Sequence, residues 1–219
     1  MNVLELFSGS AILAREARAR GHRAVTLDRD MEANLMVDIM DVRVRDILDH
    51  VFSGERVDMV WASPPCDGFS VAAIGKHWAM VDGLPVPKHP TSRHGLILLG
   101  RTLAIIKAIN PTVWYLENPR GMMRKMALLD GHQRTTITQC QYGKTYMKPT
   151  DVWHNNPHWK ARPACTRGAP CHERAPRGSR QGLQGVKAVA ERAALPKQLC
   201  VEVIKAAERA TRARAEGVG

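Results

Sequence analysis

The first half of the chain alternates between short apolar segments and segments of helical character, and this alternation restricts the possible folds more than any other feature. Apolar runs bounded by turn residues, which are typical of buried strands, occur at residues 3–6, 24–28, 57–62 and 112–117. Segments that fit helices lie between them, at residues 11–18, 43–52 and 95–109. Strands that alternate with helices favour a mostly parallel sheet covered on both faces, which is a doubly wound α/β fold.

Two stretches interrupt this pattern. Residues 71–94 and 155–186 lack periodicity and are rich in Gly, Pro and basic side chains. Irregular segments of this length are usually functional or mobile. A last helix is predicted at 198–209. We therefore expect three parts, which are a main domain at 1–152, a small basic segment at 153–190, and a C-terminal helical part at 191–219 that packs back on the main domain.

Charge narrows the class of partner. The 219 residues carry a formal net charge of +11, and from Lys160 to the end 13 Lys and Arg stand against 5 Glu. This basic excess favours nucleic acid, although a basic surface without a partner is an equal alternative. No run reaches the roughly 20 apolar residues of a membrane helix. The N-terminus does not have the pattern of a secretory signal, so we expect a cytoplasmic location and no membrane.

A tight turn, Phe7-Ser8-Gly9-Ser10, follows the first strand and leads into a helix. Gly9 leaves room where a ligand could approach the backbone, and a helix start presents free amide donors. Asp28 ends the next strand, where a carboxylate can accept hydrogen bonds from ribose hydroxyls. The turn lacks the additional glycines of a pyrophosphate-binding loop. It therefore favours a cofactor with adenosine but without phosphate.

Two further segments at strand ends carry chemically useful groups. Pro64-Pro65-Cys66 follows one strand, and its prolines would hold a thiol rigidly at the edge of the sheet. A thiolate there could add to an electron-poor ring. Glu117 ends the next core strand, and a carboxyl at the same edge could protonate or hydrogen-bond a ring nitrogen. A buried structural cysteine and a solvated acid are the plainer interpretations, but the pair in this order is more informative than either residue.

The order Leu-Phe-Ser-Gly-Ser, Leu-Asp-Arg-Asp, Pro-Pro-Cys-Asp-Gly-Phe-Ser and Glu-Asn-Pro resembles the cytosine-5 DNA methyltransferase family, from residue 2 to about 152, with a weaker echo at 192–207. The short length resembles the compact phage- or prophage-encoded members, and a restriction-modification role would suit one. The resemblance implies a Rossmann-like, class I S-adenosylmethionine-dependent methyltransferase domain at 1–152. It also implies double-stranded DNA as partner, a monomer, and a location in the bacterial host cell or at its nucleoid.

The resemblance assigns roles to individual residues. Cys66 would attack carbon 6 of a flipped cytosine, Glu117 would stabilise the ring, and Asn118 would complete the catalytic set. Carbon 5 would then take the methyl group from S-adenosylmethionine. The residues expected at the cofactor are Phe7, Ser8, Gly9, Ser10, Asp28, Arg29, Asp38, Ile39 and Pro64. Those expected at the substrate are Ser63, Phe69, Ser70, Arg120, Lys148 and Thr150.

The sequence departs from the family pattern at three places. Asn-Pro replaces the more usual Asn-Val, and Ala11 stands where many members have Gly. Lys148 and Thr150 stand where family members have arginines that help hold the target base. The loop at 67–94 is the candidate lid over that base. The basic segment at 153–190 is short for target recognition, so we expect a short recognition site or relaxed specificity.

A possible metal site lies in the basic segment, where Cys165, Cys171 and His172 fall within eight residues. Three thiolates and one imidazole suit structural zinc, with Cys140 as the fourth ligand and with His154 or His158 as equal alternatives. The gap between the two nearby cysteines is wider than usual for zinc, so the sequence favours metal-free reduced thiols over a zinc site.

Three other functions stay open. Amino-methylation of adenine or cytosine uses a Pro-Pro-aromatic motif, whereas this chain has Cys66 after its prolines. The same carbon-5 reaction on RNA is equally compatible with the basic segment. A non-catalytic DNA-binding relative would keep the fold, but the intact Cys66 and Glu117 argue against it.

Overall fold

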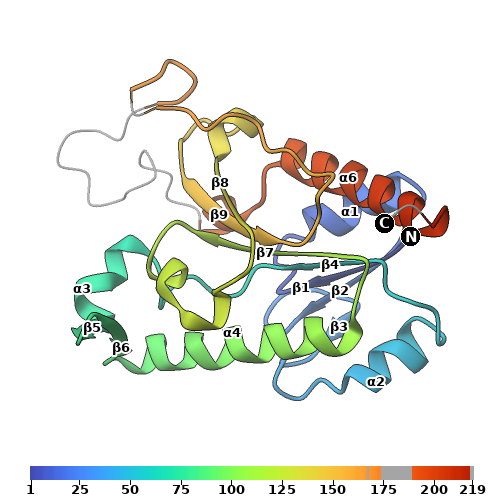
Figure 1. The fold of residues 1–219 in the computed structure, drawn as a ribbon, viewed down its shortest axis with the longest axis horizontal. Helices are drawn as coiled ribbons and strands as arrows, with labels where there is room; N and C mark the ends of the chain where they lie inside the picture. The colour runs from blue at the N-terminus through green and yellow to red at the C-terminus, as the bar shows by residue number, and fades with distance from the viewer. Residues whose placement is uncertain (167, 174–188, 218–219) are drawn as a thin grey trace.

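The computed structural model describes residues 1–166, 168–173 and 189–217. A seven-stranded sheet runs through the molecule in the order β3-β2-β1-β4-β7-β9-β8 (Figure 1). The strands, in chain order, are β1 (Asn2–Leu6), β2 (Arg23–Asp28), β3 (Leu35–Met36), β4 (Met59–Ala62), β7 (Val113–Pro119), β8 (Arg134–Thr138) and β9 (Pro149–His154). Neighbours from β3 to β7 pair in parallel, and β9 is antiparallel to both β7 and β8. The predicted Rossmann-like, mostly parallel sheet is confirmed.

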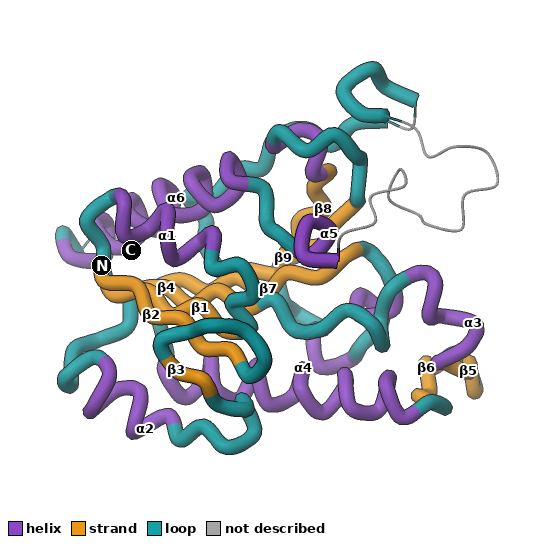
Figure 2. The backbone as a smooth tube through the Cα atoms, turned by 180° about the vertical axis from the view of Figure 1, so that it is seen from behind, coloured by secondary structure: helices purple, strands orange, loops and turns teal. Residues whose placement is uncertain are grey.

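Helices cover both faces of this sheet. The helices α1 (Ile12–Ala19) and α6 (Lys197–Ala215) lie together on one face, and α4 (Pro90–Ile109) lies on the other beside α2 (Val44–Asp46), as Figures 1 and 2 show. The central strands β1, β4 and β7 are buried along almost their whole length. A strand covered on both faces needs apolar side chains in both directions, so these strands appear in the sequence as continuous apolar runs.

Shorter elements connect these layers. They are the π-helical turn η1 (Ile47–Val51), the helical turns η2 (Val71–Ala73), α3 (Ile74–His77), η3 (Met122–Lys125), η4 (Ala127–Leu129) and η5 (Gln139–Tyr142), the helix α5 (Val189–Ala193), and a separate hairpin of β5 (Trp78–Val81) and β6 (Leu84–Pro87). Because β5 and β6 pair and α4 starts at Pro90, the prediction of an irregular stretch over all of 71–94 was wrong.

The earlier start of α4 has a local cause. Pro90 occupies the first helical position, where a missing N–H costs nothing, and the ring of His89 accepts the N–H of Thr91 at 3.2 Å. The apolar run that begins near Gly95 shows only the part of the helix that faces the core. In the same way, α6 continues to Ala215, beyond the predicted end at 209. The strand β9 reaches His154, so the boundary predicted after residue 152 falls inside a strand.

A buried carboxyl supports the start of α1. The residue before that helix, Ala11, has no side chain that could cap it, and Glu5 on β1 instead accepts the N–H of Ala14 at 2.8 Å. Burial raises the pKa of Glu5 to about 7. The backbone hydrogen bond from Ala14 and the charge of Arg18 lower this pKa, but burial outweighs them. A side chain of the sheet, Glu5 on β1, therefore supports the start of α1.

Among the described residues, no helix has the length and apolar character needed to cross a membrane.

Candidate active site

Cys66 and Glu117 follow neighbouring parallel strands and lie at the same edge of the sheet. β4 and β7 pair with Ala62 opposite Leu116, so the chain leaves β4 directly beside Glu117. Ser63 follows β4, forms a hydrogen bond with Glu117, and accepts the indole N–H of Trp61 on its Oγ at 2.8 Å. The sheet register thus brings together the two groups that the sequence placed at strand ends.

The loops that carry these two residues are tied to each other. Asn118 is fully buried and donates its Nδ2 to the carbonyl of Pro64 at 2.9 Å. The carbonyl of Phe69 accepts the N–H of Met122 at 2.7 Å, and a Cβ on Gly121 would lie 2.2 Å from that carbonyl oxygen. A glycine is therefore required where the second loop crosses the first.

Burial dominates the ionisation of both groups. It raises the pKa of Glu117, and Asp151 adds to this rise, whereas Lys148 and the hydrogen bond with Ser63 lower it. Burial also raises the pKa of the Cys66 thiol, with further increases from Asp67 and Glu117 and a decrease from Lys148. The site thus favours a neutral carboxyl that can donate a proton, and a thiol that must lose its proton before it can attack.

The structure separates the two positions where family members have arginines. Lys148 lowers the pKa of both Cys66 and Glu117, so its charge acts on both strand-end groups. Its Nζ also donates to the carbonyl of Arg192 at 2.5 Å. Thr150 is fully buried, and its Oγ1 donates to the carbonyl of Lys148 and accepts from Gln139. Thr150 therefore supports the local backbone, whereas the charge of Lys148 lowers the pKa of both Cys66 and Glu117.

The turn between β1 and α1 has the shape of a ligand cradle. Phe7, Gly9 and Ala11 all adopt positive φ angles, of 56°, 50° and 50°. Two of these three residues bear a side chain that disfavours this conformation, so the turn is held by its surroundings. A Cβ built on Gly9 meets nothing within 4 Å, and the buried Oγ of Ser8 has no hydrogen-bond partner among the described residues.

Acidic residues flank this cradle. The carboxylate of Asp28 accepts the N–H of Gly9 at 2.9 Å through one oxygen, and the N–H groups of Asp30 and Met31 through the other. Asp28 thus fixes the turn as well as presenting an acid beside it. Asp38 accepts from the N–H of Met40 and pairs with Arg29 at 3.3 Å, and both contacts lower the pKa of its carboxyl.

The remaining predicted site residues differ in their exposure. Phe69 is fully buried against Trp78, and Ile39 is buried in the main core. Arg120 is exposed at the sheet edge, where its N–H donates to the carbonyl of Pro149. Pro64 is buried, whereas Ser10 and Arg29 are exposed and Ser70 is half-buried in a bridge to Gly121. The side chains of Phe69 and Ile39 therefore shape the site from within the core.

The candidate lid contains both buried aromatic side chains and exposed cations. His77 and Trp78 are buried, and the indole N–H of Trp78 donates to the carbonyl of Gly68 at 2.6 Å. The side chains of Lys76, Lys88 and Arg93 are exposed. The hairpin that begins at Trp78 is thus joined to the loop that carries Cys66.

One ion pair beside the site has no signal in the sequence. Asp151 on β9 is fully buried, and Arg124 holds both of its carboxylate oxygens, at 2.9 and 2.6 Å, while Thr136 donates to one of them at 2.7 Å. The three residues come from separate elements that only the pairing of β8 with β9 brings together. No local pattern marks them.

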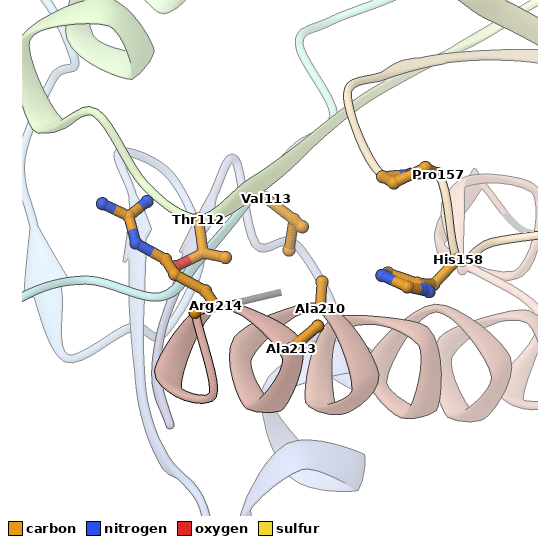
Figure 3. Close-up of a pocket in the computed structure, with 8 residues that line it drawn as sticks. Thr112, Val113, Pro157, His158, Ala210, Ala213 and Arg214 are labelled. Carbon is orange, nitrogen blue, oxygen red and sulfur yellow. The ribbon is translucent and has the colours of Figure 1, made fainter. Parts of the chain in front are cut away.

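A separate hollow of about 300 Å³ lies at the opposite end of the sheet (Figure 3). It is lined by Thr112 and Val113 at the start of β7, by His158, and by Ala210 and Arg214 of α6. Glu117 is four residues further along β7, which is roughly 13 Å of extended chain. This hollow is therefore distinct from the edge that carries Cys66.

Three cysteines and one histidine also come together away from the catalytic pair. The ligand atoms of Cys140, Cys165, Cys171 and His172 all lie within 4.8 Å of one another. Cys140 belongs to η5, directly after β8, and the other three belong to the irregular segment. The sequence offered Cys140, His154 and His158 equally as the fourth ligand. Cys140 joins the cluster, whereas His154 forms a hydrogen bond with Thr135.

Comparisons with known proteins identify the family and the fold of the chain. No protein-family model matches the chain. A Frog virus 3 (isolate Goorha) protein named "Probable DNA (cytosine-5)-methyltransferase" is 30% identical over 160 residues, which are 70% of this chain and 70% of that protein. A crystal structure from E. coli, described as a DNA modification methyltransferase encoded within a prophage, superposes with a TM-score of 0.50 at 16% identity.

The superposition covers 70% of this chain and 46% of the E. coli protein, so the chain spans about half of that protein. The structural likeness establishes the fold, which is that of the class I methyltransferases. The sequence likeness to the viral protein establishes the family. This chain belongs to the DNA (cytosine-5)-methyltransferase family, and the resemblance expected from the sequence is confirmed.

Proposed function

We propose that this chain transfers a methyl group from S-adenosylmethionine to carbon 5 of cytosine in double-stranded DNA. The observation that carries the proposal is the meeting of Cys66 and Glu117 at one edge of the sheet, in a member of this family. An amino-methylating enzyme has no use for a thiol at this position or for a buried acid opposite it. The pair suits addition to a pyrimidine ring.

The proposed reaction starts at the Cys66 thiol, which gives its proton to solvent under the influence of the Lys148 charge. The thiolate adds to carbon 6 of a cytosine that has left the base stack. Burial favours the protonated form of Glu117, which would donate its proton toward ring nitrogen N3, so that electron density collects at carbon 5. After methylation, carbon 5 loses its proton to solvent, the carbon–sulfur bond breaks, and Glu117 recovers its proton.

The cradle between β1 and α1 fits the proposed cofactor. The unpartnered Ser8 Oγ and the open space at Gly9 would accept a polar ligand that lies close to the backbone. Asp28 and Asp38 would bind hydroxyl and amino groups of the nucleoside. Phe7, Ser10, Arg29, Ile39 and Pro64 complete the set that we assign to the cofactor. When bound there, S-adenosylmethionine supplies an electrophilic methyl group.

We assign DNA contact to the basic segment at 153–190 and to the exposed cations Lys76, Lys88 and Arg93. Phosphate contacts from such side chains would hold the duplex, while the short segment reads few bases. RNA is the second candidate substrate, because positive charge attracts both polymers equally.

A trapping experiment tests this proposal. The purified chain is mixed with S-adenosylmethionine and with either DNA or RNA that contains 5-fluorocytosine, and a covalent adduct is sought on a denaturing gel. We expect an adduct with duplex DNA that is lost in Cys66→Ser and kept in the matched thiol control Cys200→Ser. An adduct with RNA alone would assign the substrate to RNA. No adduct with either polymer, from protein that binds S-adenosylmethionine, would overturn the enzymatic function.

A further inference from the structure

The cysteine and histidine cluster has the dimensions of a metal site. A tetrahedral zinc ion with Zn–S bonds of about 2.3 Å holds its ligand atoms about 3.8 Å apart. Here the distance from Cys171 Sγ to Cys140 Sγ is 3.7 Å, and His172 Nδ1 lies 3.7 Å from Cys165 Sγ and 3.6 Å from Cys171 Sγ. Cys140 and Cys165 are closer, at 3.2 Å, and no disulfide joins them.

The segment that supplies three of these ligands contributes little to the buried core. None of its described residues from 161 to 173 is fully buried, and none lies in a helix or strand. Cys140, by contrast, is buried in η5 between Gln139 and Tyr142, which are 1% and 2% exposed. A bound ion would therefore fasten an irregular segment to the core of the molecule.

Backbone contacts on both sides of the cluster hold the ligands toward one another. The N–H of Cys165 donates to Thr138 Oγ1 at 2.9 Å, and the N–H of Glu173 donates to the carbonyl of Thr145 at 2.8 Å. Arg162 lies at the start of the segment, donates to the carbonyl of Gln141 at 2.6 Å, and pairs with Glu202 of α6 at 2.6 Å. These contacts lie on both sides of the three ligands that the segment supplies.

We propose that Cys140, Cys165, Cys171 and His172 bind one structural zinc ion, which fastens the segment at 161–173 to the end of β8. Three thiolates and one imidazole form a closed set with no position left for water, as structural zinc sites require. Neighbouring contacts connect the ion to the active site. Gln139 precedes the first ligand and donates to Thr150, beside Lys148.

The proposal is tested first on metal content, which does not depend on methyl transfer. The full chain is purified without added metal, exposed to a mild chelator, and analysed by mass spectrometry for bound elements. We expect about one zinc ion per chain in the wild type, and a loss of most of it in Cys171→Ser and in His172→Ala. Cys171 is exposed, so its replacement spares the core. The control Cys200→Ala removes a thiol from α6 and should keep the full zinc content.

Amide hydrogen exchange gives a second measurement. We expect the N–H groups of Cys165 and Glu173 to exchange at least about tenfold faster in Cys171→Ser, while those of β4 and β7 keep their rates. Wild-type protein without metal would overturn the proposal, whether its thiols are free or joined in a disulfide. Zinc retained equally in Cys171→Ser, or iron in its place, would also overturn it. None of these results bears on trapping by Cys66, so the two proposals can fail separately.

Discussion

The sheet edge with Cys66 and Glu117 and the cluster of Cys140, Cys165, Cys171 and His172 are built in opposite ways. At the sheet edge, parallel pairing of β4 with β7 places both groups, and buried side chains surround them. In the cluster, three of the four residues come from a segment in which none of the described side chains is fully buried. The fold alone is enough to form the first site. We expect the second site to need a bound ion that its four side chains share.

This difference predicts which changes each region tolerates. A residue at the sheet edge is connected to the core through backbone hydrogen bonds, so a small steric change there should move the catalytic groups. A change in the cluster should release the segment and leave the sheet intact. The first experiment below measures the sheet edge and uses the cluster as its reference, and the next two compare the sheet edge with matched sites elsewhere in the fold.

The largest effect is expected from Cys66→Ser. A hydroxyl is a far weaker nucleophile than a thiolate, so methyl transfer to DNA should fall by roughly a thousandfold or more. Transfer of a labelled methyl group measures this loss. The zinc content of the variant should equal that of the wild type, because Cys66 is not part of the cluster. Activity that survives within tenfold would contradict the assignment of the nucleophile.

The buried pair of Arg124 and Asp151 tests the rigidity of the sheet edge. Arg124→Leu leaves a carboxylate with 0% exposure without its cation, and we expect about 3–5 kcal/mol less free energy of unfolding. Urea denaturation measures this value. Arg20→Leu is the control, because it breaks the partly exposed pair with Glu208 and should cost under about 1 kcal/mol. Equal losses in the two variants would show that burial does not set the strength of these pairs.

The contact between the two loops is tested by Gly121→Ala. The added methyl group would meet the Phe69 carbonyl at 2.2 Å, so the loops must separate. We expect a fall in kcat of about a hundredfold, equivalent to roughly 3 kcal/mol, because the catalytic groups lose their alignment. Gly100→Ala within α4 is the matched control. Its methyl group has space, and alanine favours a helix, so activity should hold and stability should rise by about 1 kcal/mol.

The smallest effect concerns Glu5. Burial raises its pKa to about 7 in the folded protein, above the ordinary 4.5 of a glutamate, so the native state binds the proton more tightly than the unfolded state. The stability that this group contributes is present at low pH and is lost as the pH rises through 7, by on the order of 2 kcal/mol. Glu5→Gln should reduce this fall, as urea denaturation at pH 5 and pH 8 would show. An unchanged difference between the two pH values would contradict the role of Glu5.

Much of the catalytic edge could be predicted before the structure was known. Short apolar runs with turns between them predict parallel strands, and parallel strands end at one edge, so Cys66 and Glu117 had to be neighbours if the sheet was correct. The start of α4 at Pro90 and the hairpin after Trp78 were missed, because their side chains are only partly buried and leave no periodic apolar pattern.

By itself, the sequence determined the class of fold, the family and the two strand-end motifs, since each depends on residues close together in the chain. Only the tertiary structure decided that Cys140, rather than His154 or His158, joins Cys165, Cys171 and His172. It also decided that the charge of Lys148 acts on Cys66 and Glu117, whereas Thr150 is buried and bonded to the backbone. It also decided the pairing of Arg124 with Asp151. The physical reason is that local patterns encode burial and backbone conformation, whereas contacts between polar side chains from distant segments depend on how the finished sheet brings them together.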